Sequence, residues 1–245
     1  LGDVYKRQAC EALELGSVDM AVVDMAQLIR MEKNDENLPY GVVISGVLKR
    51  GDSRYVMIRK RHAKDLIENA VVATDSYSKT ERIKHMYDGI SCVVETDIRK
   101  CIEKLDASEC DAVFVLLEDI KAARLHNSFL YRYTIMDYGE CVPVHGAGVY
   151  AMLTKGKKEA VRTARELSHK STAECFEIED DIISRVMQNV YVKTCDVYAR
   201  ISSDRLEIYA DVTGNRGRIR VNERGTFVNK NLIITKIVDR ISKSM

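Results

Sequence analysis

Residues 141–179 read CVPVHGAGVYAMLTKGKKEAVRTARELSHKSTAECFEIE, and this stretch decides the fold more than any other part of the chain. Its first part spaces Pro143, Gly146 and Gly148 as Pro-x-x-Gly-x-Gly beside an apolar run. Taken alone, that pattern indicates only a tight turn or a close approach of two backbones. Its second part is polar, rich in alanine and helical in character. The two parts together, at this distance, are far more specific than either one.

The stretch resembles hydroxymethylbilane synthase, also called porphobilinogen deaminase. Sequences of that family read roughly L-P-A-V-G-Q-G-A and then L-N-H-x-x-T-A-x-x-x-x-E-R. The second pattern is matched by five residues of this chain, namely Leu167, His169, Thr172, Ala173 and Glu179. Four more segments follow the family's order and spacing: 11–25, 38–54, 71–83 and 102–115. This agreement indicates a relative of the family rather than chance.

Valine- and isoleucine-rich runs alternate with helical patterns in the first two thirds of the chain. Residues 18–25 and 40–48 are typical of buried strands. Residues 78–89 and 97–109 predict helices, the second with Asp97 as its N-cap. The alternation predicts an α/β fold with a mostly parallel sheet.

The last third of the chain has a different pattern. A polar helical segment from Lys155 is followed by alternating apolar and polar residues at 190–214 and from 218 onward. This predicts an antiparallel meander ended by a helix, and so a small α+β domain at the C-terminus.

The resemblance implies three domains, of which the first two resemble type II periplasmic binding proteins. Residues 9–53 and 143–167 would be the remainder of domain 1. Residues 54–142 would form domain 2, and residues 168–245 the C-terminal α+β domain. Residues 1–8 fit neither the family nor the amphipathic segment after them, so we interpret them as non-native sequence. On that interpretation about 60 residues of the family's first domain precede this fragment.

Composition narrows the class of protein. The 38 basic and 37 acidic residues balance, so bulk charge predicts neither a nucleic-acid nor a membrane partner. No apolar run approaches the roughly 18 residues needed to span a bilayer. Seven cysteines without C-x-x-C spacing argue against a disulfide framework or a metal site. We therefore expect a cytoplasmic monomer that binds a small molecule and no metal.

The resemblance implies a transferase of tetrapyrrole (heme, siroheme or cobalamin) biosynthesis. The family condenses four porphobilinogen units into hydroxymethylbilane and releases ammonia, using a dipyrromethane cofactor attached to one cysteine. Counting forward from Glu179 puts Val190 at that position, and counting back from Tyr198 puts Tyr191 there. Cys195 is the nearby candidate for attachment, because a thiolate forms stable carbon–sulfur bonds. The alternative is that Cys195 is a small apolar residue of a strand.

The family's catalytic aspartate stabilises a cationic intermediate, and Gln27 occupies the matching position. Gln27 keeps a hydrogen-bond acceptor but lacks the negative charge. Asp24, three residues earlier, is the candidate substitute, and a capping role at the end of a strand is its alternative.

Arginines hold the substrate's acetate and propionate groups in the family. Glu95 and Cys101 stand at two of these arginine positions, and only Lys79 keeps a cation. Thr74, Ser76 and Lys79 are the candidate anion-binding turn, because backbone amides at the start of a helix point toward a ligand. An ordinary serine-rich helix cap is the equal alternative.

Two hypotheses of function follow. The first is a sequence-divergent hydroxymethylbilane synthase. The second is a non-catalytic module of the same fold that binds a small anion or a pyrrole. A bacterial solute-binding protein would share the sheet topology, but the landmarks between residues 102 and 179 favour the synthase family.

Overall fold

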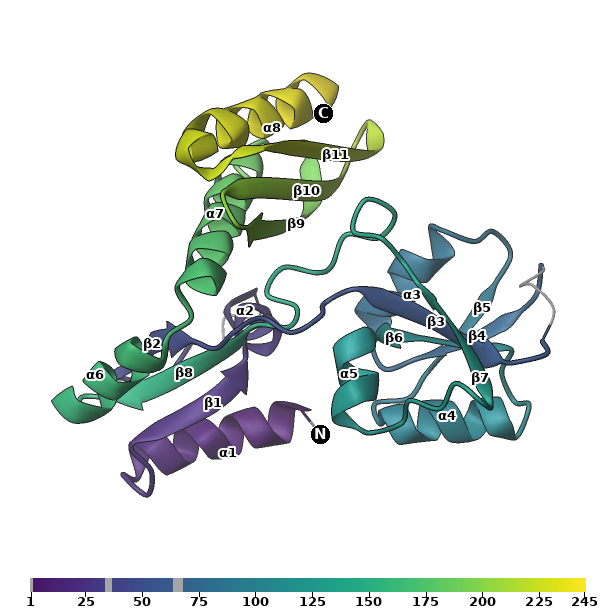
Figure 1. Ribbon diagram of the computed structural model, residues 1–245, viewed down its shortest axis with the longest axis horizontal. Coiled ribbons are helices and arrows are strands. Elements are labelled where there is room, and N and C mark those ends of the chain that lie inside the picture. The colour runs from purple at the N-terminus through teal and green to yellow at the C-terminus, as the bar shows by residue number, and fades with distance from the viewer. Residues whose placement is uncertain (1, 34–36, 64–67) are drawn as a thin grey trace. The chain divides into compact units, whose positions relative to one another are not determined.

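The computed structural model describes residues 2–33, 37–63 and 68–245 and divides into two compact units (Figure 1). The inserted unit comprises residues 52–141. The outer unit comprises residues 2–51 together with 142–245.

The inserted unit is built on a five-stranded sheet in the order β5-β4-β6-β3-β7. Its strands are β3 (Tyr55–Lys60), β4 (Val71–Thr74), β5 (Ser91–Val94), β6 (Ala112–Leu116) and β7 (Tyr131–Ile135). β4 pairs in parallel with β5 and β6, whereas β3 pairs antiparallel with β6 and β7. The prediction of a mostly parallel sheet was therefore wrong for β3, whose two pairings are both antiparallel. Strand and helix alternate from β4 to β7, which gives the crossovers that parallel pairing needs, but β3 lies between β6 and β7 and runs antiparallel to both.

Helices cover both faces of this sheet: α3 (Tyr77–Lys84) on one, and α4 (Ile98–Asp106) with α5 (Leu117–Ala122) on the other. Because side chains alternate along each strand, neighbouring residues of a strand point into the two cores on opposite faces of the sheet. The predicted helix after Asp97 is confirmed, since the Asp97 carboxylate accepts a hydrogen bond from Arg99 N at 2.9 Å. The predicted helix at 78–89 ends earlier, at Lys84.

The first part of the outer unit contains α1 (Gly2–Glu14), β1 (Met20–Asp24), α2 (Met25–Lys33), β2 (Val42–Val47), β8 (Tyr150–Lys155) and α6 (Lys158–Leu167). Its three strands form an antiparallel sheet in the order β1-β8-β2. α1 and α2 share a core with this sheet, and α6 packs directly on β2 at Gly46, where an added Cβ would lie 2.5 Å from Ala164 O. α1 includes residues 2–8, whose assignment as non-native sequence stays a prediction.

The C-terminal part of the outer unit contains α7 (Lys170–Val186), β9 (Val192–Ser202), β10 (Arg205–Gly214), β11 (Gly217–Thr226), the 3₁₀ turn η1 (Phe227–Asn229) and α8 (Lys230–Ser244). The strands form an antiparallel meander in the order β11-β10-β9 (Figure 1). α7 and α8 supply Ile182 and Ile237 to a core that also holds Leu206 and Ile208 of β10. The predicted α+β region, a meander ended by a helix, is confirmed, and the fold as a whole is α/β.

None of the helices described in residues 2–33, 37–63 and 68–245 is both long and apolar enough to cross a membrane. Within the same ranges no cluster of three or more histidine, cysteine, aspartate or glutamate side chains is arranged to hold a metal ion.

Candidate functional site

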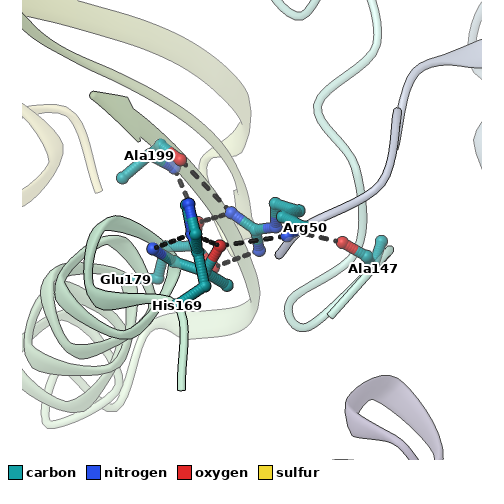
Figure 2. Close-up of polar contacts among 6 residues, drawn as sticks. Arg50, Ala147, His169, Glu179 and Ala199 are labelled. Atoms are coloured by element: carbon teal, nitrogen blue, oxygen red, sulfur yellow. Dashed lines mark hydrogen bonds and ion pairs between the residues drawn. The ribbon is translucent and has the colours of Figure 1, made fainter. Parts of the chain in front are cut away.

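Glu179 of α7, the last residue of the signature stretch 141–179, forms a buried ion pair with Arg50, which follows β2. Arg50 Nη1 and Nη2 lie 2.5 Å and 2.9 Å from Glu179 Oε1 and Oε2 (Figure 2). The two side chains are only 9% and 0% exposed. Burial alone would lower the pKa of Arg50, but attraction and hydrogen bonding to Glu179 outweigh burial and raise it. The Arg50 guanidinium therefore stays charged in the interior because Glu179 is beside it.

Backbone groups complete the hydrogen bonding of this pair (Figure 2). Ala199 N donates to Glu179 Oε1 at 2.7 Å, while Arg50 donates to the carbonyls of Ala199 and Ala147, each at 3.2 Å. The guanidinium also lies over the Tyr198 ring, 4.7 Å from its centroid. The pair thus connects α7 to β9 and to the loop of residues 143–148 before β8, which we call the glycine loop. Its role is structural rather than chemical.

His169 and Thr172 of the same stretch fix the start of α7. Thr172 N donates to His169 Nδ1 at 3.3 Å, so the imidazole acts as the N-cap of the helix. His169 N donates to Val47 O at 2.8 Å, and Arg50 N donates to Thr172 Oγ1 at 3.0 Å. The family signature therefore forms one connected junction around Arg50.

The glycine loop of the signature packs against the first turn of α2. Gly146 has a φ of +80°, and an added Cβ would lie 2.8 Å from Ile29 Cδ1 and 3.0 Å from Ala26 N. Met25 N donates to Val149 O at 2.8 Å. A larger residue at 146 would be strained both by its backbone conformation and by this contact. The glycine is required by packing.

Asp24 and Gln27, the predicted catalytic candidates, lie together at the start of α2. Asp24 Oδ1 accepts a hydrogen bond from Gln27 N at 3.2 Å, which is the geometry of a capping aspartate. The Gln27 side chain is half-buried. The structure gives Asp24 a local capping bond, and Gln27 carries no charge at the family's aspartate position.

Thr74, Ser76 and Lys79 lie together in the inserted unit, where β4 ends and α3 begins. Ser76 is the N-cap of α3 but makes no capping bond through its side chain, and its Oγ lies 3.2 Å from Ser78 Oγ. Thr74 is fully buried, and its hydroxyl has no hydrogen-bond partner among the described residues. The turn thus offers hydroxyl groups and the first amides of a helix.

The positive charge of Lys79 in this turn is neutralised by two carboxylates of the same unit. Lys79 is buried, and its Nζ lies 2.7 Å from Asp75 Oδ2 and 3.5 Å from Asp119 Oδ2. Burial alone would lower the pKa of Lys79, but the two carboxylates outweigh burial and raise it. The ammonium is therefore charged but already paired, so it adds little attraction for a ligand.

Two other positions that hold arginine in the family are also occupied by internal contacts. Glu95 Oε1 lies 3.3 Å from Lys104 Nζ. Cys101 is buried on α4, and burial raises the pKa of its thiol to about 12. Neither side chain offers a positive charge to a substrate carboxylate.

The dipyrromethane cofactor does not fit at either candidate position. Cys195 is 7% exposed on β9 and belongs to the core formed with α7 and α8, on the same side of the strand as Val197 and Ala199. A pair of pyrrole rings on its sulfur would displace closely packed side chains. Tyr191 lies in the loop before β9, is half-exposed, and has no sulfur.

The match to a known family extends over most of the chain. Residues 2–163 match the family model described as "Porphobilinogen deaminase, dipyromethane cofactor binding domain". The chain belongs to the porphobilinogen deaminase family. The sequence-based assignment to this family is thus confirmed.

Several family members are similar at low identity. The porphobilinogen deaminase of Clostridium acetobutylicum is 22% identical, over 83% of this chain and 74% of the relative. That of Chlorobium luteolum is 24% identical, over 77% of this chain and 60% of the relative. The probable porphobilinogen deaminase of Picrophilus torridus is 23% identical, over 69% and 61%. The chain thus matches about three fifths of the length of the last two.

Similar solved structures include substrate-binding proteins. The second substrate-binding domain of a putative amino acid ABC transporter from Streptococcus pneumoniae is 14% identical, with a TM-score of 0.46 over 69% of this chain and 74% of that chain. The periplasmic aliphatic sulphonate binding protein SsuA from Escherichia coli is 15% identical, with a TM-score of 0.43 over 74% and 61%.

Sequence reasoning missed the role of Arg50. Its partner Glu179 is 129 residues away, so no local pattern joins them. The signal that was present is that both residues stand inside matched family segments. A charged residue that is kept inside an apolar segment, with an opposite charge kept in another, indicates a buried pair.

Proposed function

We propose that this member of the porphobilinogen deaminase family binds a small carboxylate- or phosphate-bearing ligand, of the porphobilinogen class, without attaching a dipyrromethane. The observation that carries the proposal is the burial of the Cys195 side chain in the C-terminal core. Loss of the aspartate charge at Gln27 supports it, because a cationic intermediate would lack its main electrostatic stabilisation.

The turn from Thr74 to Lys79 is the proposed ligand contact. A bound anion would accept hydrogen bonds from the first amides of α3 and from the hydroxyls of Ser76 and Ser78. The buried Thr74 hydroxyl, which has no hydrogen-bond partner among the described residues, supports this assignment. Because Lys79 is paired with Asp75, we expect weak binding, dominated by hydrogen bonds rather than by net charge.

The first test is the intact mass of the protein after incubation with porphobilinogen. We expect an unmodified chain and no hydroxymethylbilane in the mixture. A mass gain of two pyrrole units, located at Cys195 by peptide mapping and accompanied by turnover, would overturn the proposal and restore the synthase activity. Peptide mapping makes the result independent of whether Cys195→Ala folds.

The second test is calorimetric titration with porphobilinogen and, separately, with inorganic phosphate. Thr74→Val keeps the shape of the side chain and removes its hydroxyl, so we expect several-fold weaker binding of the ligand that occupies the turn. Ser53→Ala is the matched control, because Ser53 also buries a hydroxyl without a hydrogen-bond partner in the described structure. Equal affinity of wild type and Thr74→Val would remove the turn from the proposal.

We also propose a cytoplasmic location. No disulfide bond joins any of the seven cysteines, all of which lie in the described part of the chain, and this is typical of a reducing compartment. The monomeric state stays a prediction, and sedimentation of the purified chain tests it.

A further inference from the structure

An exposed apolar turn projects from the inserted unit just before β7. Phe129 is 88% exposed and its neighbour Leu130 is 56% exposed. Single exposed apolar residues are common, but two large ones at the tip of one turn form a candidate contact surface for an apolar environment. We call residues 127–131 the Phe129 turn.

The Phe129 turn is held by hydrogen bonds within the unit. Phe129 N and Leu130 N both donate to Asn127 Oδ1, at 3.1 and 3.3 Å. Tyr131 N donates to Asn127 O at 3.0 Å, and Asn127 N donates to the Tyr133 hydroxyl at 2.8 Å. The two apolar side chains are therefore presented by an ordered backbone, which lowers the entropy lost on binding.

The carbonyl groups of the turn also have partners. Arg61 N donates to Leu130 O at 2.8 Å, and Arg61 Nη1 donates to Ser128 O at 2.5 Å. Burying polar backbone without hydrogen bonds is costly in an apolar medium. These amides and carbonyls keep their hydrogen bonds when water is removed, which suits the interface of a lipid bilayer.

The residues around the turn are basic. Arg61 and His62 leave β3 beside it, Arg132 follows it on β7, and Arg124 precedes it, all with exposed side chains. Neither residues 55–63 nor residues 120–136 contain an aspartate or a glutamate. Asp106 of α4 does contact the turn, since its carboxylate accepts the Tyr131 hydroxyl at 2.6 Å. Although the whole chain is balanced in charge, the two segments 55–63 and 120–136 carry only basic charges.

We propose that the Phe129 turn and its arginines dock the protein on an anionic lipid surface. Phe129 and Leu130 enter the headgroup region, and Arg61, Arg124 and Arg132 face the lipid phosphates. Each basic residue near an anionic leaflet adds binding energy that salt weakens. The contact is peripheral, needs no membrane-spanning helix, and is independent of the proposed ligand turn at Thr74.

The test is co-sedimentation of the full chain with vesicles of phosphatidylcholine containing phosphatidylglycerol. We expect binding to these vesicles at low salt, and weak binding to vesicles of phosphatidylcholine alone. Phe129→Ser with Leu130→Ser should reduce the partition coefficient by about tenfold, as should Arg124→Gln with Arg132→Gln. Val190→Ser is the matched control, because Val190 is 86% exposed on a turn of the outer unit and should leave binding unchanged.

Asn127→Ala separates the composition of the turn from its geometry. It keeps every apolar and basic side chain but removes the hydrogen bonds from Phe129 N and Leu130 N to Asn127 Oδ1. We therefore expect several-fold weaker vesicle binding. Equal binding by wild type and the Phe129→Ser, Leu130→Ser variant overturns the proposal. Binding to soluble polyglutamate without binding to anionic vesicles also overturns it, and would assign the basic surface to an acidic polypeptide partner.

Discussion

Arg50 and Glu179 form a two-pronged ion pair in the interior of the outer unit, although 129 residues separate them in the chain. Four segments meet around this pair: the loop after β2, the glycine loop before β8, helix α7 and strand β9. Its members come from two separate family motifs. The strongest sequence signature of the family thus encodes, in this chain, a junction that holds elements together.

Breaking the pair from one side should be strongly destabilising. Glu179→Gln leaves the Arg50 charge buried without its partner, so we expect a loss of about 3 kcal/mol or more in the free energy of unfolding, measured with urea. The combined replacement Arg50→Met with Glu179→Leu should recover much of that loss.

The exposed pair of Arg185 and Asp181 provides the control, with a distance of 2.7 Å between Nε and Oδ1. Asp181→Ala should cost no more than about 1 kcal/mol, because water screens both charges. A Glu179→Gln loss as small as that of Asp181→Ala would contradict the structural role of the buried pair.

His169 should contribute to stability as a helix cap. His169→Ala removes the acceptor of the Thr172 amide and should lower the free energy of unfolding by about 1 kcal/mol. His169→Asn supplies another capping acceptor and should recover most of the loss. Thermal unfolding followed by circular dichroism measures both, with the exposed Lys170→Ala as control. Equal losses in the alanine and asparagine variants would show that His169 acts through its packing.

Local features of this chain were predictable from sequence, and contacts across the chain were not. The Asp97 cap and the β9–β11 meander follow from neighbouring residues. The orientation of Cys195 also had a local signal, because it alternates in register with Val197 and Ala199 on one face of a strand. The antiparallel pairing of β3 with β6 depends on where distant segments meet, and no periodicity reports that.

The candidate ligand turn at residues 74–79 also combines a local contact, which sequence predicts, with a long-range contact, which it does not. Asp75 and Lys79 stand four residues apart at the start of a helix, and this spacing by itself indicates an ion pair. The second partner, Asp119, comes from α5 and has no sequence signal. Sequence therefore locates the turn, whereas its full neutralisation depends on how α5 packs beside it.

Removing Asp75 should expose the charge of Lys79 to ligands. Asp75→Asn leaves the ammonium with Asp119 alone, so we expect a loss of about 2 kcal/mol in the free energy of unfolding. An added phosphate ion can then supply the missing negative charge. The rise in thermal midpoint on adding phosphate should be larger in Asp75→Asn than in wild type. Glu81→Gln, an exposed change on the same helix, is the control, and equal shifts in all three proteins would contradict the expectation.

The pair of Arg200 and Glu207 should make the C-terminal sheet sensitive to acid. A hydrogen bond from Arg200 lowers the pKa of Glu207, with burial opposing the shift and the charge of Arg200 adding to it. Since the folded pKa is below the unfolded value of about 4.3, the stabilisation is present above that value and is lost as the pH falls through the folded pKa.

Glu207→Gln should therefore reduce the fall in stability on acidification below about pH 4. Urea midpoints recorded across the acid range measure the difference, with the exposed Glu177→Gln as control. An unchanged acid profile in Glu207→Gln would show that the pair does not contribute to stability.

The thiols should be slow to react in the native protein. Six of the seven cysteines are buried, and Cys92 is half-buried. Burial raises the pKa of Cys110 and of Cys175 to about 11, so their reactive thiolate forms are rare near neutral pH. A chromogenic disulfide reagent should thus modify Cys92 first and slowly, and all seven thiols rapidly in denaturant.

Cys195→Ala should leave the native reaction unchanged, because Cys195 faces the core. A Cys195 that reacts as fast in the native protein as in the unfolded chain would place its sulfur in solvent, where a cofactor could be attached.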